Sequence, residues 1–163
     1  MIENAWRILN SVNEWVRYAD AKASGALAGA GVLTGALTAA GLSDKFQSAP
    51  DAAVGFGAAA GACAILSAAI ALWSLLPTLR ADEPASLIYF DHVARQFRDD
   101  AQGHAEAVRS LIADENMYFD QVAAQAWANS KVARAKFLAS GWALFSLGVA
   151  VLLAGVAGII TVF

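Results

Sequence analysis

Three long stretches of the chain contain no Asp, Glu, Lys or Arg: residues 23–43, 52–79 and 137–163. They are 21, 28 and 27 residues long. A helix needs about 20 mostly apolar residues to cross the hydrocarbon core of a bilayer. The pattern therefore predicts three transmembrane helices, at residues 23–43 and near 54–77 and 138–161.

The first of these stretches allows other interpretations because it is rich in Ala and Gly, and Ala gains little on transfer to lipid. A buried helix of a soluble protein and a cleaved signal peptide are the alternatives. The preceding 22 residues carry three acidic and three basic side chains. A signal peptide has a short, positively charged start and a shorter apolar run. The charges and the length together favour a spanning helix.

The polar segments between the apolar stretches also have a helical pattern. In residues 2–20, apolar side chains recur at steps of three and four and share one face: Ile2, Trp6, Leu9, Val12 and Val16. The same spacing runs through the segment between Phe90 and Ile112, where Gly103 predicts a break. Pro50 and Asp51 fit one helix start, Asp82-Glu83-Pro84 another, and Asp114 an N-cap.

No turn signal follows Asp114, so the last polar helix is expected to continue into the third span as one rod. There is no strand pattern, and the predicted fold class is an all-α integral membrane protein with a cytosolic helical region. Four segments are expected: an N-terminal amphipathic helix at 1–22, two spans and an outward loop at 23–79, cytosolic helices at 80–136, and the third span at 137–163.

The distribution of basic residues predicts the topology. Segment 1–22 holds three, segment 44–51 holds one, and segment 80–136 holds seven of the 11 Lys and Arg residues. Basic residues accumulate on the cytoplasmic side of a membrane protein. We therefore expect a multi-pass membrane protein with the N-terminus and residues 80–136 in the cytoplasm.

Composition argues against several function classes. The net charge is −3 and no polybasic tail is present, so binding of a nucleic-acid polymer has no electrostatic support. Cys63 is the single cysteine, and His92 and His104 have no partners at metal-ligand spacing; His92 and Asp91 fit the wet face of a helix. No nucleophile, acid–base set or phosphate-binding loop is visible, so neither an enzyme, a metal site nor a cofactor is expected.

Charged side chains gather where the chain enters and leaves the spans. One interpretation is anchoring of the spans, with structural ion pairs to Asp20. The other is a small anion site in which basic side chains hold a phosphate and aromatic rings form the walls. For this second interpretation the cations are Arg80, Lys131, Arg134 and Lys136, and the rings are Tyr89 and Trp127. Asp20 and Lys22 would then lock the entry of the first span.

Twelve of the 13 glycines lie in the apolar stretches. Gly141, Gly148 and Gly155 are spaced by seven and share one helix face, while Gly25/Gly29, Gly31/Gly35 and Gly57/Gly61 are pairs four apart. Small residues let helices approach closely in lipid. The glycines fit packing within one three-helix bundle or between subunits. Because three spans are too few to enclose a pore, a homo-oligomer is expected.

Several short motifs, in their order and spacing, resemble one protein family. They are Asp20-Ala21-Lys22-Ala23 at the first span, Leu76-Pro77 and Arg80 after the second, Leu87-Ile88-Tyr89-Phe90, and then Gln125, Lys131 and Lys136-Phe137 before the third. Over about residues 5 to 160 the chain resembles the transmembrane effector family (PycTM) of the bacterial Pycsar antiphage system.

The resemblance implies a function that composition alone does not. Members of this family lie in the bacterial inner membrane and respond to cyclic UMP or cyclic CMP, which a partner nucleotide cyclase makes after phage infection. They then damage the membrane, so that the host stops growing or dies. The alternative from the residues is an inner-membrane interaction or scaffold protein, whose cytosolic helices dock a protein partner without a small ligand.

Overall fold

The computed structural model of the chain describes residues 1–43, 48–77 and 86–162, and all regular elements within these ranges are helices. They are α1 (Ile2–Gly41), α3 (Asp51–Leu75), α4 (Phe90–Gln96), α5 (Ala101–Ala113) and α6 (Glu115–Val162). The all-α prediction is confirmed. The helices form two compact units, which we call the polar unit (Met1–Arg17 and Pro77–Ala135) and the span unit (Tyr18–Leu76 and Lys136–Phe163).

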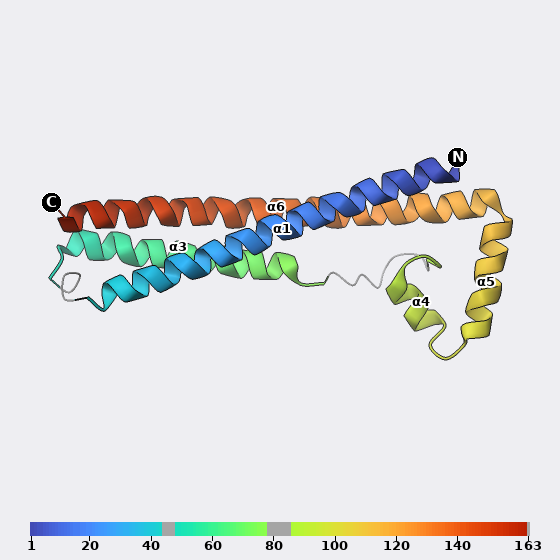
Figure 1. Cartoon of the computed structure of the whole chain (residues 1–163), viewed down its shortest axis with the longest axis horizontal. Helices are drawn as coiled ribbons and strands as arrows, with labels where there is room; N and C mark the ends of the chain where they lie inside the picture. Colours follow the sequence, from blue (N-terminus) through green and yellow to red (C-terminus); the bar gives the residue numbers. More distant parts are fainter. Residues whose placement is uncertain (44–47, 78–85, 163) are drawn as a thin grey trace. The chain divides into compact units, whose positions relative to one another are not determined.

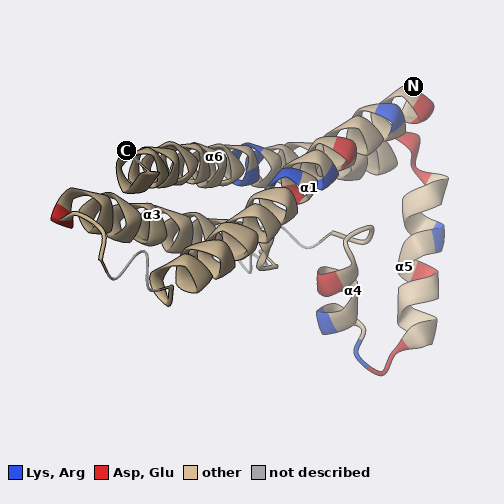
Figure 2. Ribbon diagram, turned by 60° about the vertical axis from the view of Figure 1, so that its left-hand side comes forward, with Lys and Arg blue, Asp and Glu red and all other residues tan. Residues whose placement is uncertain are grey.

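The span unit consists of the second part of α1, all of α3 and the second part of α6, which lie side by side (Figure 1). Each of these helices is long and apolar enough to cross a membrane, which confirms the prediction of three spans. Within these three helices, Figure 2 shows charged residues only at the start of α3 and in the earlier parts of α1 and α6. The charge-free surfaces match a hydrocarbon environment.

The interior of the span unit is built from the two smallest side chains available besides glycine. The buried residues are Ala19, Ala23, Ala26, Ala30, Ala53, Ala60, Ala64, Ser67, Ala71, Ser74, Ala139, Ser140, Ala143, Ser146, Ala150 and Ala157. Large apolar side chains point outward instead, among them Ile65, Trp142 and Leu152. Lipid is as apolar as Leu, so helices in a membrane gain from close contact rather than from burying large side chains.

Gly141, Gly148 and Gly155 do not bring α6 close to another described helix, although their spacing would allow it. A Cβ atom at Gly29 would lie 2.9 Å from Leu147 Cδ2, so this glycine of α1 meets α6 closely. At Gly141, Gly148 and Gly155 a Cβ atom would meet nothing within 4 Å. The interpretation that these three glycines pack inside the bundle is therefore wrong. The positions buried between the helices are alanines and serines instead.

The polar unit has its own core between the first turns of α1 and α6. Buried Ala5, Leu9, Val122 and Ala126 form this core, and Trp6, Ile88, Tyr118 and Phe119 pack against it. Trp6 Nε1 donates a hydrogen bond to the Tyr118 hydroxyl at 3.1 Å. The amphipathic face predicted for residues 2–20 thus packs on α6.

The predicted helix boundaries have mixed outcomes. α3 begins at Asp51, and the Asp114 carboxylate accepts hydrogen bonds from the backbone N–H groups of Asn116 and Met117, both at 3.0 Å. The break predicted at Gly103 lies a few residues earlier, at residues 97–100 between α4 and α5. Gly103 itself lies in the first turn of α5, and its N–H donates to the side chain of the capping residue Asp100. The Asp82-Glu83-Pro84 turn lies outside the described residues.

Two long helices run without a break through segments that the sequence pattern treats separately. α1 continues from its amphipathic part into the first apolar stretch. α6 contains 48 residues and continues from the capping Asp114 to Val162, as predicted from the missing turn signal.

Candidate functional site

Three of the predicted ligand residues lie on one exposed face of α6. Trp127, Lys131 and Arg134 follow each other at steps of four and three, which places them on the same side of a helix. Val122 and Ala126 face the core of the polar unit, whereas Trp127 is 62% exposed. The three side chains form an aromatic and basic strip, which we call the α6 strip.

The chemistry of the α6 strip fits a small aromatic anion. Lys131 Nζ lies 3.2 Å from the centroid of the Trp127 ring, a close cation–π contact. Arg134 is exposed and has no ion pair among the residues that the structure describes. A guanidinium and an ammonium are strong donors to a phosphate, and an indole is a stacking surface for a base.

Lys136 is not part of this strip. Its Nζ donates a hydrogen bond to Asp20 Oδ1 at 2.6 Å, and its side chain is only 11% exposed against 36% for Asp20. In the neighbouring residues, Lys22 Nζ lies 4.6 Å from the centroid of the Phe137 ring. These two contacts join α1 to α6 within the span unit, and we call them the α1–α6 clasp. They favour the structural interpretation of Asp20, Lys22 and Lys136.

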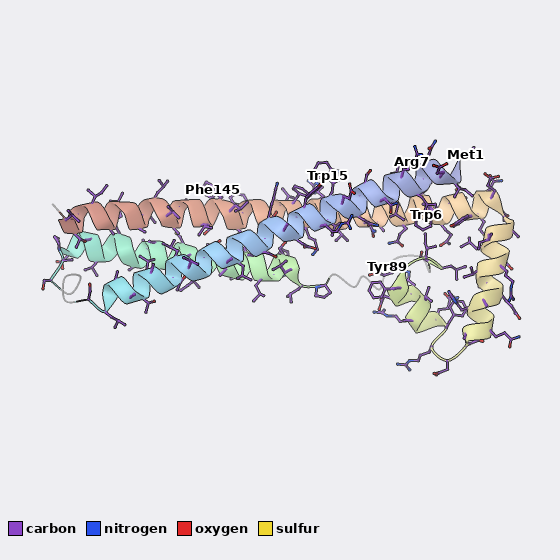
Figure 3. The ribbon with its side chains drawn as sticks, viewed as in Figure 1. Met1, Trp6, Arg7, Trp15, Tyr89 and Phe145 are labelled. Atoms are coloured by element: carbon purple, nitrogen blue, oxygen red, sulfur yellow. The ribbon has the colours of Figure 1, made fainter. Side chains whose placement is uncertain are left out.

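The remaining predicted residues lie elsewhere. Tyr89 precedes α4 as its N-terminal capping residue, and its ring contacts Phe90 and His92 with centroid distances of 5.0 Å in both cases (Figure 3). Arg80 lies outside the described residues. The structure thus gathers three of the six predicted ligand residues in the α6 strip and locates Tyr89 and Lys136 in other contacts.

The segment before α4 is held by side chains that the sequence interpretation missed. Gln121 Oε1 accepts a hydrogen bond from the Leu87 backbone N–H at 3.3 Å. His92 Nδ1 accepts one from the Ser86 N–H at 3.1 Å, and Asp91 pairs with Arg95 at 3.0 Å. The prediction that His92 and Asp91 face solvent is wrong, because both residues are half-buried: His92 contacts Ser86, and the Asp91 side chain is only 14% exposed.

A chain of amides between α1 and α6 was also missed. Asn129 Nδ2 donates to Asn13 Oδ1 at 2.7 Å, and Gln125 Nε2 donates to Asn129 Oδ1 at 2.8 Å. Asn13 lies four residues after Leu9, where α1 faces the core. A polar residue at such a position fixes the register of two packed helices, and this departure from the apolar pattern is the signal that could have identified it.

Within each unit, α1 and α6 pair with the same sequence offset. Asn13 with Asn129, in the polar unit, and Asp20 with Lys136, in the span unit, are each 116 residues apart. The two helices are therefore parallel, and each unit has one polar layer that specifies their register.

The fold and these contacts define a class: a helical membrane protein with three spans and an exposed aromatic and basic strip on α6. Residues 4–162 match the PycTM family, described as the Pycsar effector protein domain. The Pycsar effector protein PtPycTM of Propioniciclava tarda is 31% identical over 99% of this chain and 76% of its own length. MePycTM of Micromonospora echinofusca is 50% identical over 29% of this chain and 81% of its own length.

No solved structure gives a significant match to the chain. The match over nearly the whole length nevertheless decides the family: the chain belongs to the Pycsar effector proteins. Its role is that of a membrane effector in antiphage defence.

Proposed function

We propose that this effector senses a cyclic pyrimidine mononucleotide, cyclic UMP or cyclic CMP, and then disrupts the bacterial inner membrane, which leads to abortive infection. A nucleotide cyclase would be its functional partner and would make the activating nucleotide. Family membership supports this role. The proposed location of the ligand site rests on the α6 strip. It supplies two cations for one phosphate and an indole for one base.

In this proposal Trp127, Lys131 and Arg134 make the first contacts with the nucleotide, and Tyr89 and Arg80 complete the site. Lys136 stays in its ion pair with Asp20, which competes with any phosphate for its ammonium group. α6 is one helix from Glu115 to Val162, so a shift at the α6 strip reaches the third span through its backbone. The nucleotide drives the change only if it binds the disrupting state more tightly.

An interaction protein without a small ligand is the second candidate. Phe90 is 70% exposed and Ile112 is 63% exposed on the polar unit, and exposed apolar side chains of this size favour docking of a protein. A thermal-shift screen with cyclic mononucleotides and cyclic dinucleotides separates the two. Stabilisation by cyclic UMP or cyclic CMP supports the sensor, and no shift with any nucleotide favours the interaction protein.

The topology in this proposal places the N-terminus and residues 80–136 in the cytoplasm. In a Cys63→Ala background, Gln47→Cys is expected to react in intact cells with a reagent that does not cross the inner membrane, and His104→Cys is not. Both should react after the membrane is opened. Labelling of His104→Cys but not of Gln47→Cys in intact cells would contradict this orientation.

The effector is also proposed to be a homo-oligomer, with the Gly141, Gly148 and Gly155 row at the subunit contact. Phe145, which flanks this row, is 64% exposed and points away from α3 (Figure 3). Glycine is the least favourable residue in a helix after proline, yet no residue of the described ranges comes within 4 Å of a Cβ atom placed at these three. A second copy of α6 that approaches closely would use that space.

The glycine row therefore gives a prediction. Gly148→Leu is expected to reduce the oligomer at a given detergent-to-protein ratio by about tenfold, because a large side chain keeps two helices apart. The melting temperature of the monomer should not fall, since a Cβ atom there meets nothing within 4 Å. Gly25→Leu, at another open position on α1, is the matched control. A wild-type chain that is monomeric with and without nucleotide would refute the oligomer.

A further inference from the structure

Four of the five buried polar residues of the described chain are serines of the span unit. Two of them bond across α3 and α6, and a third, Ser74, is buried on the same face of α3 as Ser67. Ser67 Oγ donates to the Ala143 carbonyl at 2.7 Å, and Ser146 Oγ donates to the Cys63 carbonyl at 2.8 Å. These two contacts show that α3 and α6 are antiparallel and fix their register.

The third serine, Ser74, differs from the other two. It is 4% exposed, and its hydroxyl has no hydrogen-bond partner in the described part of the chain. Ser74 follows Ser67 by seven residues on the same face of α3. In the antiparallel register, seven residues back from Ala143 on α6 is Lys136. Ser74 therefore lies at the level of the α1–α6 clasp.

The hydroxyl groups form a row that begins at the clasp and ends near the middle of the span. From the level of Lys136 to Ser146 there are ten residues, or about 15 Å of helix. The hydrocarbon core is about 30 Å thick, so the row covers about half of it. Beyond Ser146 the buried positions are alanines, such as Ala60 and Ala150.

A buried hydroxyl without a partner costs about 1–3 kcal/mol. Helix packing alone does not account for Ser74, because alanine at this position would fill the same place without that cost. An unpartnered buried hydroxyl is instead explained by a state in which water reaches it.

We propose that in the active effector water enters between α3 and α6 along Ser74, Ser67 and Ser146, and that this hydrated row removes about half of the hydrocarbon barrier. The inference rests on the proposed membrane disruption. When α3 and α6 separate, Ser67 and Ser146 release the carbonyls of Ala143 and Cys63, and hydroxyl and carbonyl oxygens then solvate water and small ions. In the resting state the same groups bond each other, and the row is dry.

Cysteine accessibility tests the proposal in vesicles that contain the full chain with Cys63→Ala. Ser67→Cys and Ser74→Cys are each expected to resist a charged methanethiosulfonate reagent at rest. They should react at least tenfold faster when cyclic UMP or cyclic CMP is added. Val32→Cys, at a position of α1 in the same span unit that is 75% exposed and well inside the first apolar stretch, is the matched control and should stay unreactive in lipid.

A second measurement uses Ser74→Ala in the otherwise wild-type chain. Because the hydroxyl has no partner, this variant should melt at or above the wild-type temperature, yet its nucleotide-dependent ion leak should fall about fivefold or more. A structural role for Ser74 would lower the melting temperature instead. If nucleotide causes an ion leak while Ser67→Cys and Ser74→Cys stay unreactive, this inference is wrong and the proposed function stands. If the wild-type chain never leaks, both the proposed function and the inference are wrong.

Discussion

Vesicles that contain the purified effector are expected to retain a trapped dye until cyclic UMP or cyclic CMP is added, and then to leak. The resting span unit is closed by continuous contacts of Ala and Ser side chains, which leave the bilayer intact. A nucleotide that binds the disrupting state more tightly shifts the population toward it. Release of dye against nucleotide concentration measures the effect.

Alanine at Arg134 or Trp127 should raise the nucleotide concentration that gives half-maximal leakage by about ten- to a hundredfold. A hydrogen bond to a charged group contributes about 1.5–3 kcal/mol, and stacking of one base contributes about 1–3 kcal/mol. Each 1.4 kcal/mol corresponds to a factor of ten. Arg134→Lys should lie between the wild type and Arg134→Ala, because it keeps the charge without the planar donor pair.

Arg109→Ala is the matched control, since Arg109 is an exposed arginine of the same polar unit on α5. It removes the same charge and should leave the leakage curve unchanged. Unchanged curves for Trp127→Ala, Lys131→Ala and Arg134→Ala would exclude the α6 strip as the ligand site. Leakage of equal size with and without nucleotide would exclude the sensor.

Much of the fold follows from local patterns in the sequence. Charge-free stretches of sufficient length gave the three spans, and capping residues such as Asp114 gave helix starts, because both depend on a few neighbouring residues. The break near Gly103 was misplaced for a related reason: glycine weakens a helix interior, but the Asp100 carboxylate caps α5 and keeps Gly103 inside its first turn.

The pairing of helices could not be predicted in the same way. Glycine spacing indicated where helices approach, but the buried positions are Ala and Ser, and only the register of α1, α3 and α6 shows which small residues meet. The candidate site shows the same contrast between local spacing, which the sequence reveals, and the register of helices, which it does not. Spacing on one helix placed Trp127, Lys131 and Arg134 together, whereas the pairing of Lys136 with Asp20 depends on the register of two helices.

The largest effect on stability is expected from Asp20→Asn. This change leaves the ammonium of Lys136, which is 11% exposed, without a counter-charge. Loss of one partner from a buried pair costs about 3–5 kcal/mol, and partial exposure of Asp20 puts this pair at the lower end. The melting temperature in detergent should fall by about 5–10 °C. Lys136→Met should cost less, because it removes the buried charge and leaves Asp20, which is 36% exposed, in contact with water.

The double variant Asp20→Asn with Lys136→Met tests the clasp directly. It should recover most of the stability lost in Asp20→Asn, since no unpaired buried charge remains. It should also leak at lower nucleotide concentration than the wild type, because the ion pair that joins α1 to α6 in the resting state is gone.

Glu3→Gln is the matched control. The Glu3–Arg7 pair has a similar distance of 2.7 Å, but both side chains are more than 70% exposed. Such exposed pairs contribute about 0–1 kcal/mol to stability. Equal melting temperatures for Glu3→Gln and Asp20→Asn would contradict a closing role for the clasp.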